Sequence, residues 1–370
     1  MNRLGVIALA GTNNGGTYQY TLSTLQALRH TTGFDITLYG DPQNPDFVEL
    51  GYAIHPFTEP RSRQMLALAA RNVHIGLPDS FASEDVLLAP IYSLSLLHTS
   101  KPFVFTLHDL QENYYPENFS RWTRFWRRQV YTGLLARTQR VICESSYVKK
   151  DIVHFFGVPE GRAVVITAPP MRQFMVDEPG ATLQATRDRL RLPEKFLFYP
   201  AQFWAHKNHL RLIEAFREVV TEAPDLKLVL TGKKRDEYET VMAAIAKFGL
   251  SGNVVHLGYV AQEDLQAIYR LALALVMPSL FESVSIPIYE AFQVGTPVAA
   301  SGILSIPEQV GDAGLLFDPM SVASIRDAML KIAKDPDAAR LLGQKGREKM
   351  LAMTPERYGA QLQHLLLELR

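Results

Sequence analysis

Short apolar runs alternate with helical patterns along most of the chain. In the first half, helical patterns cover 17–29 and 146–156, and the apolar runs are "LGVIALA", "FDITLY", "DVLLAP", "PFVFTL", "RVICES" and "AVVITA". Apolar runs without polar alternation, separated by helices, are typical of strands in a parallel sheet that is covered on both faces. The pattern therefore predicts a Rossmann-like α/β domain.

The same alternation restarts after "APPMRQFMVDEPGATLQ", a proline-rich stretch that we interpret as an interdomain linker. The next apolar runs are "KFLFYPA", "LKLVLTG", "NVVHLGYV", "LALVMPS", "PVAAS" and "AGLLFDP", with helical patterns at 208–221, 235–248, 262–271, 287–294, 321–334 and 337–369. The predicted fold class is α/β, with two Rossmann-like β/α/β domains that face each other across a cleft. Their predicted bounds are 1–170 and 171–349, with a C-terminal helix at about 350–370 that packs back on the first domain.

Composition narrows the class of protein only slightly. The chain has 370 residues, 47% of them hydrophobic, and its 38 basic and 38 acidic side chains give no net charge that would indicate a nucleic-acid partner. The single cysteine, Cys143, excludes an internal disulfide and a cysteine-based zinc site, and its apolar run predicts a buried strand position. Because no apolar run approaches the roughly 20 residues of a membrane span, we expect a cytoplasmic protein, or one peripheral on the inner face of the membrane.

Two loops that follow strands carry candidate phosphate ligands. After the first strand, "AGTNNGG" includes Gly15 and Gly16, which allow a tight turn and close backbone approach to an anion at a helix N-terminus. Glycines that only turn a strand into a helix explain this motif equally well. Lys207 begins a helix in the second half, where the helix dipole disfavours a cation, so we favour a phosphate contact over a solvated lysine. His206 and His209 lack the carboxylate or cysteine partners of a metal site, and "DPD" at 335–337 predicts a helix cap.

The stretch "FESVSIPIYEA" places two glutamates around a helix start. Ser285 is a suitable N-cap and Pro287 suits the first turn, so a helix is predicted to begin near Ile286. Its first N–H groups can hold a diphosphate. Glu282 then lies in the preceding loop, and Glu290 lies one turn inside the helix. Either glutamate taken alone is explained as well by an ordinary solvated charge.

The segment "ESVSIPIYE" resembles the E-x7-E signature of retaining, nucleotide-sugar-dependent glycosyltransferases of the GT-B fold. These belong to the glycosyltransferase family 4 or "glycosyl transferases group 1" type, which includes mannosyltransferases and glucosyltransferases. The resemblance covers nearly the whole chain, because further motifs follow in the family's order: "TLHDL", "VICESSYVKKDIVHFFGVP", "HKNHLRLIEAF", "LGYV", "GTPVAAS" and "IPEQVGDAGLLFDP".

The resemblance implies a role for each matching residue. Glu282 would contact the transferred sugar near its anomeric carbon, and His108 in "TLHDL" would face the donor sugar and the acceptor. Glu290 would accept hydrogen bonds from the nucleotide ribose. The implied donor-binding set is Gly15, Gly16, Gln202, Lys207, Ser283, Val284, Ser285 and Glu290.

Two departures from the family pattern affect the phosphate site. Gln202 occupies a position where the family often has an arginine, and residues 283–285 replace a Gly-x-Gly. We therefore expect the diphosphate charge to fall mainly on Lys207, on the helix N-terminus and on a neighbour such as Lys233.

The resemblance implies a hexosyltransferase that needs neither cofactor nor metal. The expected reaction moves a hexose, with mannose from GDP-mannose favoured, to a saccharide or lipid-linked acceptor with retention of configuration. The alternatives are a catalytically silent GT-B subunit that binds nucleotide or supports a partner transferase, a GT-B sugar-nucleotide epimerase, or a phosphorylase.

The segment 118–137 contains five arginines and no acidic residue. As a helix, it would group Arg121, Arg124 and Arg128 on one face and Trp122, Phe125 and Trp126 on another. This pattern would allow docking on an anionic membrane surface or on a phosphate-bearing acceptor. The alternative is an ordinary helix whose aromatic side chains pack inward beneath a solvated basic face.

Overall fold

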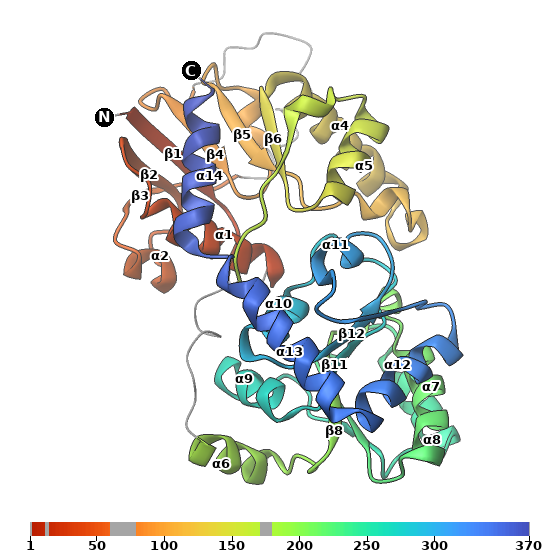
Figure 1. Ribbon diagram of the computed structural model, residues 1–370. Helices are drawn as coiled ribbons and strands as arrows, with labels where there is room; N and C mark the ends of the chain where they lie inside the picture. The colour runs from red at the N-terminus through yellow and green to blue at the C-terminus, as the bar shows by residue number, and fades with distance from the viewer. Residues whose placement is uncertain (1, 12–14, 60–78, 171–179, 370) are drawn as a thin grey trace. The chain divides into compact units, whose positions relative to one another are not determined.

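A computed structural model describes residues 2–11, 15–59, 79–170 and 180–369, and Figure 1 shows its ribbon. The chain divides into two compact units, each of which is described by itself. Unit 1 comprises Met1–Met171 together with Met353–Arg370, and unit 2 comprises Arg172–Ala352.

Unit 1 is built on a seven-stranded parallel sheet with the order β3-β2-β1-β4-β5-β6-β7. The apolar runs predicted as strands all form strands here. The structure has one strand that was not predicted, β3. It is short and largely exposed at the sheet edge, so its sequence contains no apolar run. The strands are β1 Asn2–Ala8, β2 Phe34–Gly40, β3 Ala53–Pro56, β4 Val86–Ala89, β5 Phe103–Thr106, β6 Arg140–Cys143 and β7 Ala163–Val165.

Unit 2 is built on a six-stranded parallel sheet with the order β10-β9-β8-β11-β12-β13. In both sheets the strand order reverses once, between β1 and β4 in unit 1 and between β8 and β11 in unit 2. Such a reversal is the position where open parallel sheets bind ligands beyond the carboxyl ends of their strands. The strands are β8 Phe196–Pro200, β9 Lys227–Thr231, β10 Val254–His256, β11 Ala274–Met277, β12 Val298–Ser301 and β13 Leu315–Phe317.

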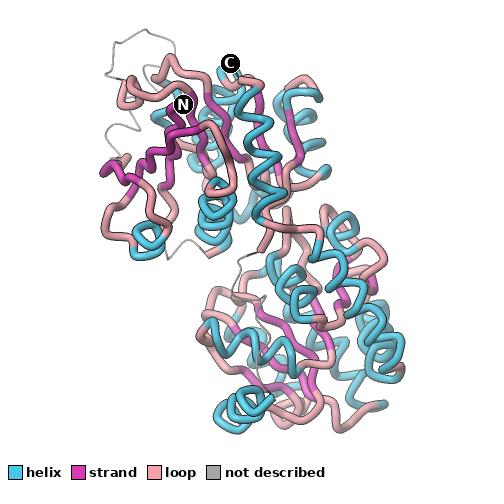
Figure 2. Tube along the Cα trace, turned by 60° about the vertical axis from the view of Figure 1, so that its left-hand side comes forward, coloured by secondary structure: helices cyan, strands magenta, loops and turns pink. Residues whose placement is uncertain are grey.

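Helices cover both faces of each sheet (Figure 2). In unit 1, one buried cluster contains Leu4 and Val6, and a second contains the neighbouring Ile7, as expected for a strand that is buried on both sides. The helices of unit 1 are α1 Gly16–Leu28, α2 Pro45–Glu49, α4 Arg121–Arg137, α5 Ser146–Phe156 and α14 Pro355–Leu367. Those of unit 2 are α6 Gly180–Leu190, α7 His209–Glu222, α8 Tyr238–Lys247, α9 Gln262–Leu271, α10 Ile286–Val294, α11 Ile306–Val310, α12 Val322–Lys334 and α13 Pro336–Leu351.

The structure differs in detail from two of the predicted segments. The proposed linker is not irregular throughout, because α6 begins at Gly180, although its residues 171–179 lie outside the described part of the chain. The segment 337–369 is helical apart from an interruption between Leu351 and Pro355, which separates α13 from α14. Pro355 lacks an N–H group and suits the first turn of a new helix, where the Thr354 hydroxyl accepts a hydrogen bond from the backbone N–H of Arg357 at 3.2 Å.

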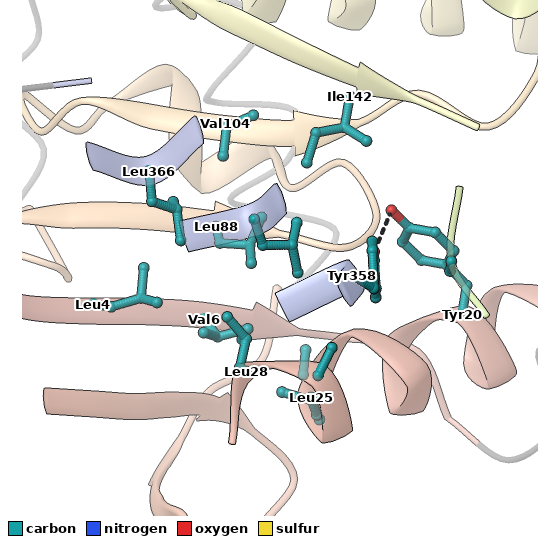
Figure 3. Close-up of a cluster of buried hydrophobic side chains, with 14 of the residues drawn as sticks. Leu4, Val6, Tyr20, Leu25, Leu28, Leu88, Val104, Ile142, Tyr358 and Leu366 are labelled. Carbon is teal, nitrogen blue, oxygen red and sulfur yellow. Dashed lines mark hydrogen bonds between the residues drawn. The ribbon is translucent and has the colours of Figure 1, made fainter. Parts of the chain in front are cut away.

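The last helix, α14, is part of the core of unit 1. Leu366 lies in the same buried cluster as Leu4 and Leu28 (Figure 3), although more than 300 residues separate them in sequence. The Tyr358 hydroxyl donates a hydrogen bond to the Tyr20 hydroxyl at 3.0 Å. At Gly359, α14 approaches α1 so closely that a Cβ atom at this position would lie 2.4 Å from the carbonyl oxygen of Ala27. Unit 1 therefore depends on the C-terminal end of the chain for its packing.

Cys143 lies fully buried at the end of β6, as predicted. Within the described residues, none of the helices combines the length and the apolar character needed to cross a membrane.

Leu366→Ala tests the contribution of α14 to unit 1. Leu366 is fully buried, whereas its neighbour Leu367 is 43% exposed. We expect Leu366→Ala to lower the free energy of unfolding by about 3 kcal/mol, because it removes apolar contacts and leaves a cavity. Leu367→Ala should change it by less than about 0.5 kcal/mol. Urea denaturation followed by circular dichroism measures both, and equal effects of the two variants would contradict this packing.

Candidate active site

An ion pair in unit 2 joins the two loops that flank the reversal of strand order. Lys207 ends the short 3-10 helix after β8, and Glu282 lies in the loop between β11 and α10. The Lys207 Nζ and Glu282 Oε1 atoms are 2.6 Å apart, and the side chains are only 22% and 11% exposed. A short charge-assisted hydrogen bond between two mostly buried groups fixes the orientation of both side chains. The structure thus brings together two of the residues predicted from sequence.

Asn208, which sequence reasoning missed, positions these loops. Its backbone has a left-handed conformation, with φ of 59°, which asparagine tolerates better than most residues. The buried side-chain amide donates to the carbonyl oxygens of Pro278 and Pro319, both at 2.9 Å. The Tyr199 hydroxyl holds the adjacent turn by donating to the Lys207 carbonyl oxygen at 2.8 Å. The signal in the sequence was an asparagine directly before a helix.

The helix α10 begins at Ile286 with Pro287 in its first turn, as predicted. Ser285 occupies the N-cap position, as predicted, but its side chain makes no capping hydrogen bond, because the hydroxyl donates instead to the sulfur of Met277 at 2.8 Å. The Ser285 N–H donates to Gln309 Oε1 at 2.9 Å, and Gln309 Nε2 donates back to the Ser285 carbonyl at 2.6 Å. This N–H group is therefore bonded to Gln309, and its implied role as a phosphate ligand stays a prediction. The roles of Ser283 and Val284 stay predictions.

Glu290 is almost completely buried inside α10. Its Oε2 atom accepts a hydrogen bond from the Tyr269 hydroxyl at 2.8 Å. Burial disfavours the carboxylate and raises its pKa from 4.5 to about 7, although the hydrogen bond from Tyr269 acts in the opposite direction. Near neutral pH the carboxyl group is thus close to half protonated. Its implied contact with a ribose stays a prediction, and Tyr269 is a partner that the sequence did not reveal.

The side chain of Arg235 lies next to that of Gln202. Arg235, from the loop after β9, donates from Nε to Gln202 Oε1 at 2.8 Å, and its guanidinium lies 5.0 Å from the Trp204 ring centre. Lys233 lies 5.2 Å from the ring centre of Tyr259. Gln202 is uncharged where the family often has an arginine, but the guanidinium of Arg235 lies beside it.

The histidines near Lys207 are not built as metal ligands. His209 is buried and stacked on Phe203, and burial together with the charge of Lys207 lowers its pKa to about 3. In the described ranges, no three histidine, cysteine, aspartate or glutamate side chains are grouped closely enough to hold a metal ion. The interpretation of 335–337 as a helix cap is confirmed, since Asp335 Oδ1 accepts from the Ala338 N–H at 3.0 Å.

In unit 1, His108 lies where the ends of β4, β5 and β6 converge. Its Nδ1 atom is 2.8 Å from Glu144 Oε2, and its Nε2 atom is 2.9 Å from the carbonyl oxygen of Pro90. Both partners are acceptors, so the ring satisfies both only as an imidazolium that donates from each nitrogen. Burial works against this charge, but the hydrogen bond and charge of Glu144 prevail and raise the pKa of His108 above its usual value. Glu144, which follows β6 in "CESS", was missed because a lone acid beside a strand has no distinctive pattern.

Gly15 and Gly16 stand at the start of α1, and both are exposed. Gly15 has φ of 55° and ψ of −122°, a conformation that side chains rarely adopt. A Cβ atom there would meet nothing within 4 Å, so the backbone angle and not crowding selects glycine. Their implied contact with a donor stays a prediction.

Comparison with known proteins defines the class. The family model described as Glycosyl transferases group 1 matches residues 184–349, and the model described as Glycosyltransferase Family 4 matches residues 14–168. Over its full length the fold matches the crystal structure of Anabaena HepE in complex with UDP and glucose, with a TM-score of 0.77, 17% identity and complete coverage of both chains. Two parallel-sheet units with these strand orders define a GT-B fold.

Curated relatives agree with this class. The O-antigen chain mannosyltransferase B of Escherichia coli is 26% identical over 256 residues, which are 68% of this chain and 66% of that protein. The O-antigen chain mannosyltransferase RfbU of Salmonella typhimurium is 23% identical over 339 residues, which are 89% of this chain and 90% of that protein. The chain therefore belongs to the GT-B glycosyltransferases of the group 1 and family 4 type, and it is similar to their mannosyltransferases.

The raised pKa of Glu290 predicts a pH-dependent stability. Below pH 4.5 the carboxyl group is protonated in both states, and from pH 4.5 to about 7 the folded state retains a proton that the unfolded state releases. Stability should therefore fall as pH rises through this window, by at most about 1.4 kcal/mol per pH unit, and then level off. Glu290→Gln should remove this slope in thermal unfolding between pH 5 and pH 8. The exposed control Glu348→Gln should keep it, and parallel curves for wild type and Glu290→Gln would contradict the assignment.

Proposed function

We propose that this glycosyltransferase is a retaining mannosyltransferase that uses a nucleotide-diphosphate mannose, GDP-mannose foremost, without a metal ion. Its acceptor is a saccharide or a lipid-linked saccharide. The mannosyltransferase relatives support the choice of sugar. The observation that carries the mechanism is the Lys207–Glu282 ion pair beside the N-terminus of α10.

This ion pair prepares both charges that the reaction needs. When the donor C1–O bond breaks, its electron pair goes to the departing diphosphate and positive charge develops at the anomeric carbon. In our proposal, the diphosphate takes the Lys207 ammonium and the first N–H groups of α10, which stabilise negative charge. Glu282 then loses its cationic partner, and its carboxylate stabilises the anomeric centre. We assign it an electrostatic and positioning role while the acceptor hydroxyl attacks the same face of the sugar and passes its proton to the departing diphosphate oxygen.

Two further groups complete the proposed assignment. Glu290 accepts hydrogen bonds from the ribose, since its second oxygen remains beyond the one bonded to Tyr269. The charged His108, held by Glu144, supplies an N–H donor for a sugar hydroxyl when its contact with Pro90 is exchanged.

Donor hydrolysis without acceptor tests the proposed function. We expect the purified chain to release GDP from GDP-mannose faster than it releases UDP from UDP-glucose, in the presence or absence of EDTA. Glu282→Gln should lower kcat about a hundredfold, because it removes a charge used mainly in the transition state. Its affinity for GDP, measured by calorimetry, should change by less than about threefold.

Three outcomes would contradict parts of this proposal. Absence of stabilisation by any nucleoside diphosphate in thermal unfolding would indicate a silent subunit, since a ligand of the folded state must raise its apparent stability. Inverted configuration of the product, determined by NMR, would overturn retention. Loss of turnover on adding EDTA would overturn metal independence.

We also propose that Arg235 supplies the phosphate charge that Gln202 lacks. The hydrogen bond from Arg235 to Gln202 places a guanidinium beside the position where the family often has its own arginine. The Trp204 ring stabilises the position of this guanidinium through a cation–π contact.

A charge swap tests this assignment. Arg235→Gln should raise the KM for the donor about tenfold and leave kcat within about twofold, since a phosphate contact held equally in ground and transition states is uniform binding. The double variant Gln202→Arg/Arg235→Gln should restore KM. The exposed control Arg340→Gln, on α13, should have no effect. Equal KM values for wild type and Arg235→Gln would refute the assignment.

A further inference from the structure

A buried tyrosine lies against the ring of His108. Tyr20, in α1, is 5% exposed, and its ring centre lies 4.6 Å from that of His108, with the two ring planes at 88°. Hydrogen bonds to Glu144 and Pro90 hold the two nitrogens of the imidazole, and Tyr20 adds an edge-to-face contact with the ring itself. Such a contact has a preferred geometry and therefore restricts rotation of the imidazole.

Two hydroxyl groups from distant elements hold the hydroxyl of Tyr20. The Tyr358 hydroxyl, in α14, donates to it at 3.0 Å (Figure 3). This leaves the proton of the Tyr20 hydroxyl for Thr106 Oγ1, which lies 2.9 Å away. Thr24 Oγ1 lies 3.0 Å from the Tyr358 hydroxyl and extends the chain of hydrogen bonds. Burial raises the pKa of both tyrosines above their usual value, so both remain neutral donors.

Both partners of the Tyr20 hydroxyl have fixed positions in the fold. Thr106 is the last residue of β5 and precedes His108 by two positions. Tyr358 lies in the first turn of α14, and the adjacent Gly359 lets this helix approach α1. The C-terminal helix is therefore connected to the histidine of the candidate site through a single side chain, that of Tyr20.

The residue after His108 is held by α4. The Arg127 Nη2 atom lies 3.3 Å from Asp109 Oδ1, and the Arg127 side chain is mostly buried. The alternative in which the aromatic side chains of this helix pack inward is wrong for Trp122 and Phe125, which are 60% and 54% exposed. Because β5 ends just before His108 and Arg127 holds the residue after it, the freedom that remains to His108 is rotation of its ring.

This freedom matters when a sugar binds. In the proposed function, His108 exchanges its contact with Pro90 for a sugar hydroxyl, and a single hydrogen bond, from Nδ1 to Glu144, then holds the ring. A ring held at one atom can turn about that bond, and the Tyr20 ring hinders this rotation because it lies against the imidazole at nearly a right angle. A misplacement of about 1 Å in a site can lower the rate by about a hundredfold.

We propose that Tyr20 and Tyr358 are positioning residues for His108. Tyr20 keeps the imidazole directed at the donor sugar, and Tyr358 acts through Tyr20 by holding its hydroxyl. The proposal rests on the proposed function for the role of His108, whereas the orientation of the ring does not depend on which sugar is transferred. The C-terminal helix therefore contributes to the reaction as well as to the packing of unit 1.

GDP-mannose hydrolysis by the full chain tests the positioning. Tyr20→Leu should lower kcat about tenfold and Tyr358→Phe about threefold, with KM within about twofold of wild type, since a misdirected group loses contacts made in the transition state. In the His108→Ala background, neither substitution should lower kcat further, because the group that they position is absent. A merely structural effect would persist in that background.

Matched substitutions in unit 1 separate positioning from packing. Tyr52→Phe removes another hydroxyl that bonds to α1, where it donates to the Leu25 carbonyl oxygen at 2.7 Å. Phe34→Leu removes a buried ring from the same hydrophobic cluster as Tyr20. Both variants should keep the kcat of wild type at temperatures where thermal unfolding shows that they are folded.

NMR of the histidine rings tests the positioning without any donor. The Cε1–H peak of His108 is identified by its absence from the spectrum of His108→Ala. Tyr20→Leu should shift this peak more than any other histidine peak, because the ring current of the tyrosine is lost. Tyr358→Phe should shift it as well, whereas Tyr52→Phe and Phe34→Leu should leave it in place.

The results separate this proposal from the proposed function. A His108 peak that stays in place in Tyr20→Leu would refute the positioning, and so would tyrosine variants that lower kcat equally with and without His108. If His108→Ala keeps the kcat of wild type, or if wild type does not hydrolyse GDP-mannose, the proposed function fails in that part. The peak shifts then decide the positioning of the ring by themselves.

Discussion

The parallel pairing of β8 with β11 is the constraint on which the candidate site in unit 2 depends. Their strand order reverses there, so the loops that leave their carboxyl ends diverge and leave room between them. The buried amide of Asn208 fixes one loop against the other by bonding to the carbonyl oxygens of Pro278 and Pro319. Lys207 and Glu282 are 75 positions apart in sequence, and this arrangement brings their charged atoms to 2.6 Å.

Buried polar groups then decide which functions remain open to each residue. The backbone N–H of Ser285 donates to Gln309, and this hydrogen bond fixes the start of α10. Glu290 is buried and accepts a hydrogen bond from Tyr269, and its burial raises the pKa of the carboxyl group to about 7. In unit 1, the acceptors Glu144 and Pro90 orient the His108 ring and favour its charged form. Each group is oriented before any ligand arrives, which lowers the cost of organising a reaction site.

Much of the fold follows from local patterns. Continuous apolar runs identified twelve strands because a strand buried on both faces tolerates few polar residues, whereas β3 escaped notice because it lies exposed at an edge. The start of α10 was predictable from Pro287, which fixes its own backbone angle. The hydrogen bonds of Ser285 were not predictable, because Met277 on β11 and Gln309 on α11 come within bonding distance of its hydroxyl and N–H groups only when unit 2 folds.

The sequence by itself determined the alternation of strands and helices and the membership of the glycosyltransferase class, since both rest on local composition and on motifs kept in order. It also selected Glu282, Lys207 and His108 as candidates. Only the tertiary structure decided their partners, the position of Arg235 beside Gln202, and the outward direction of Trp122 and Phe125. The reason is physical. Hydrogen-bond partners, burial and the charges around a side chain depend on which distant segments pack together, and a local pattern of residue types does not specify that packing.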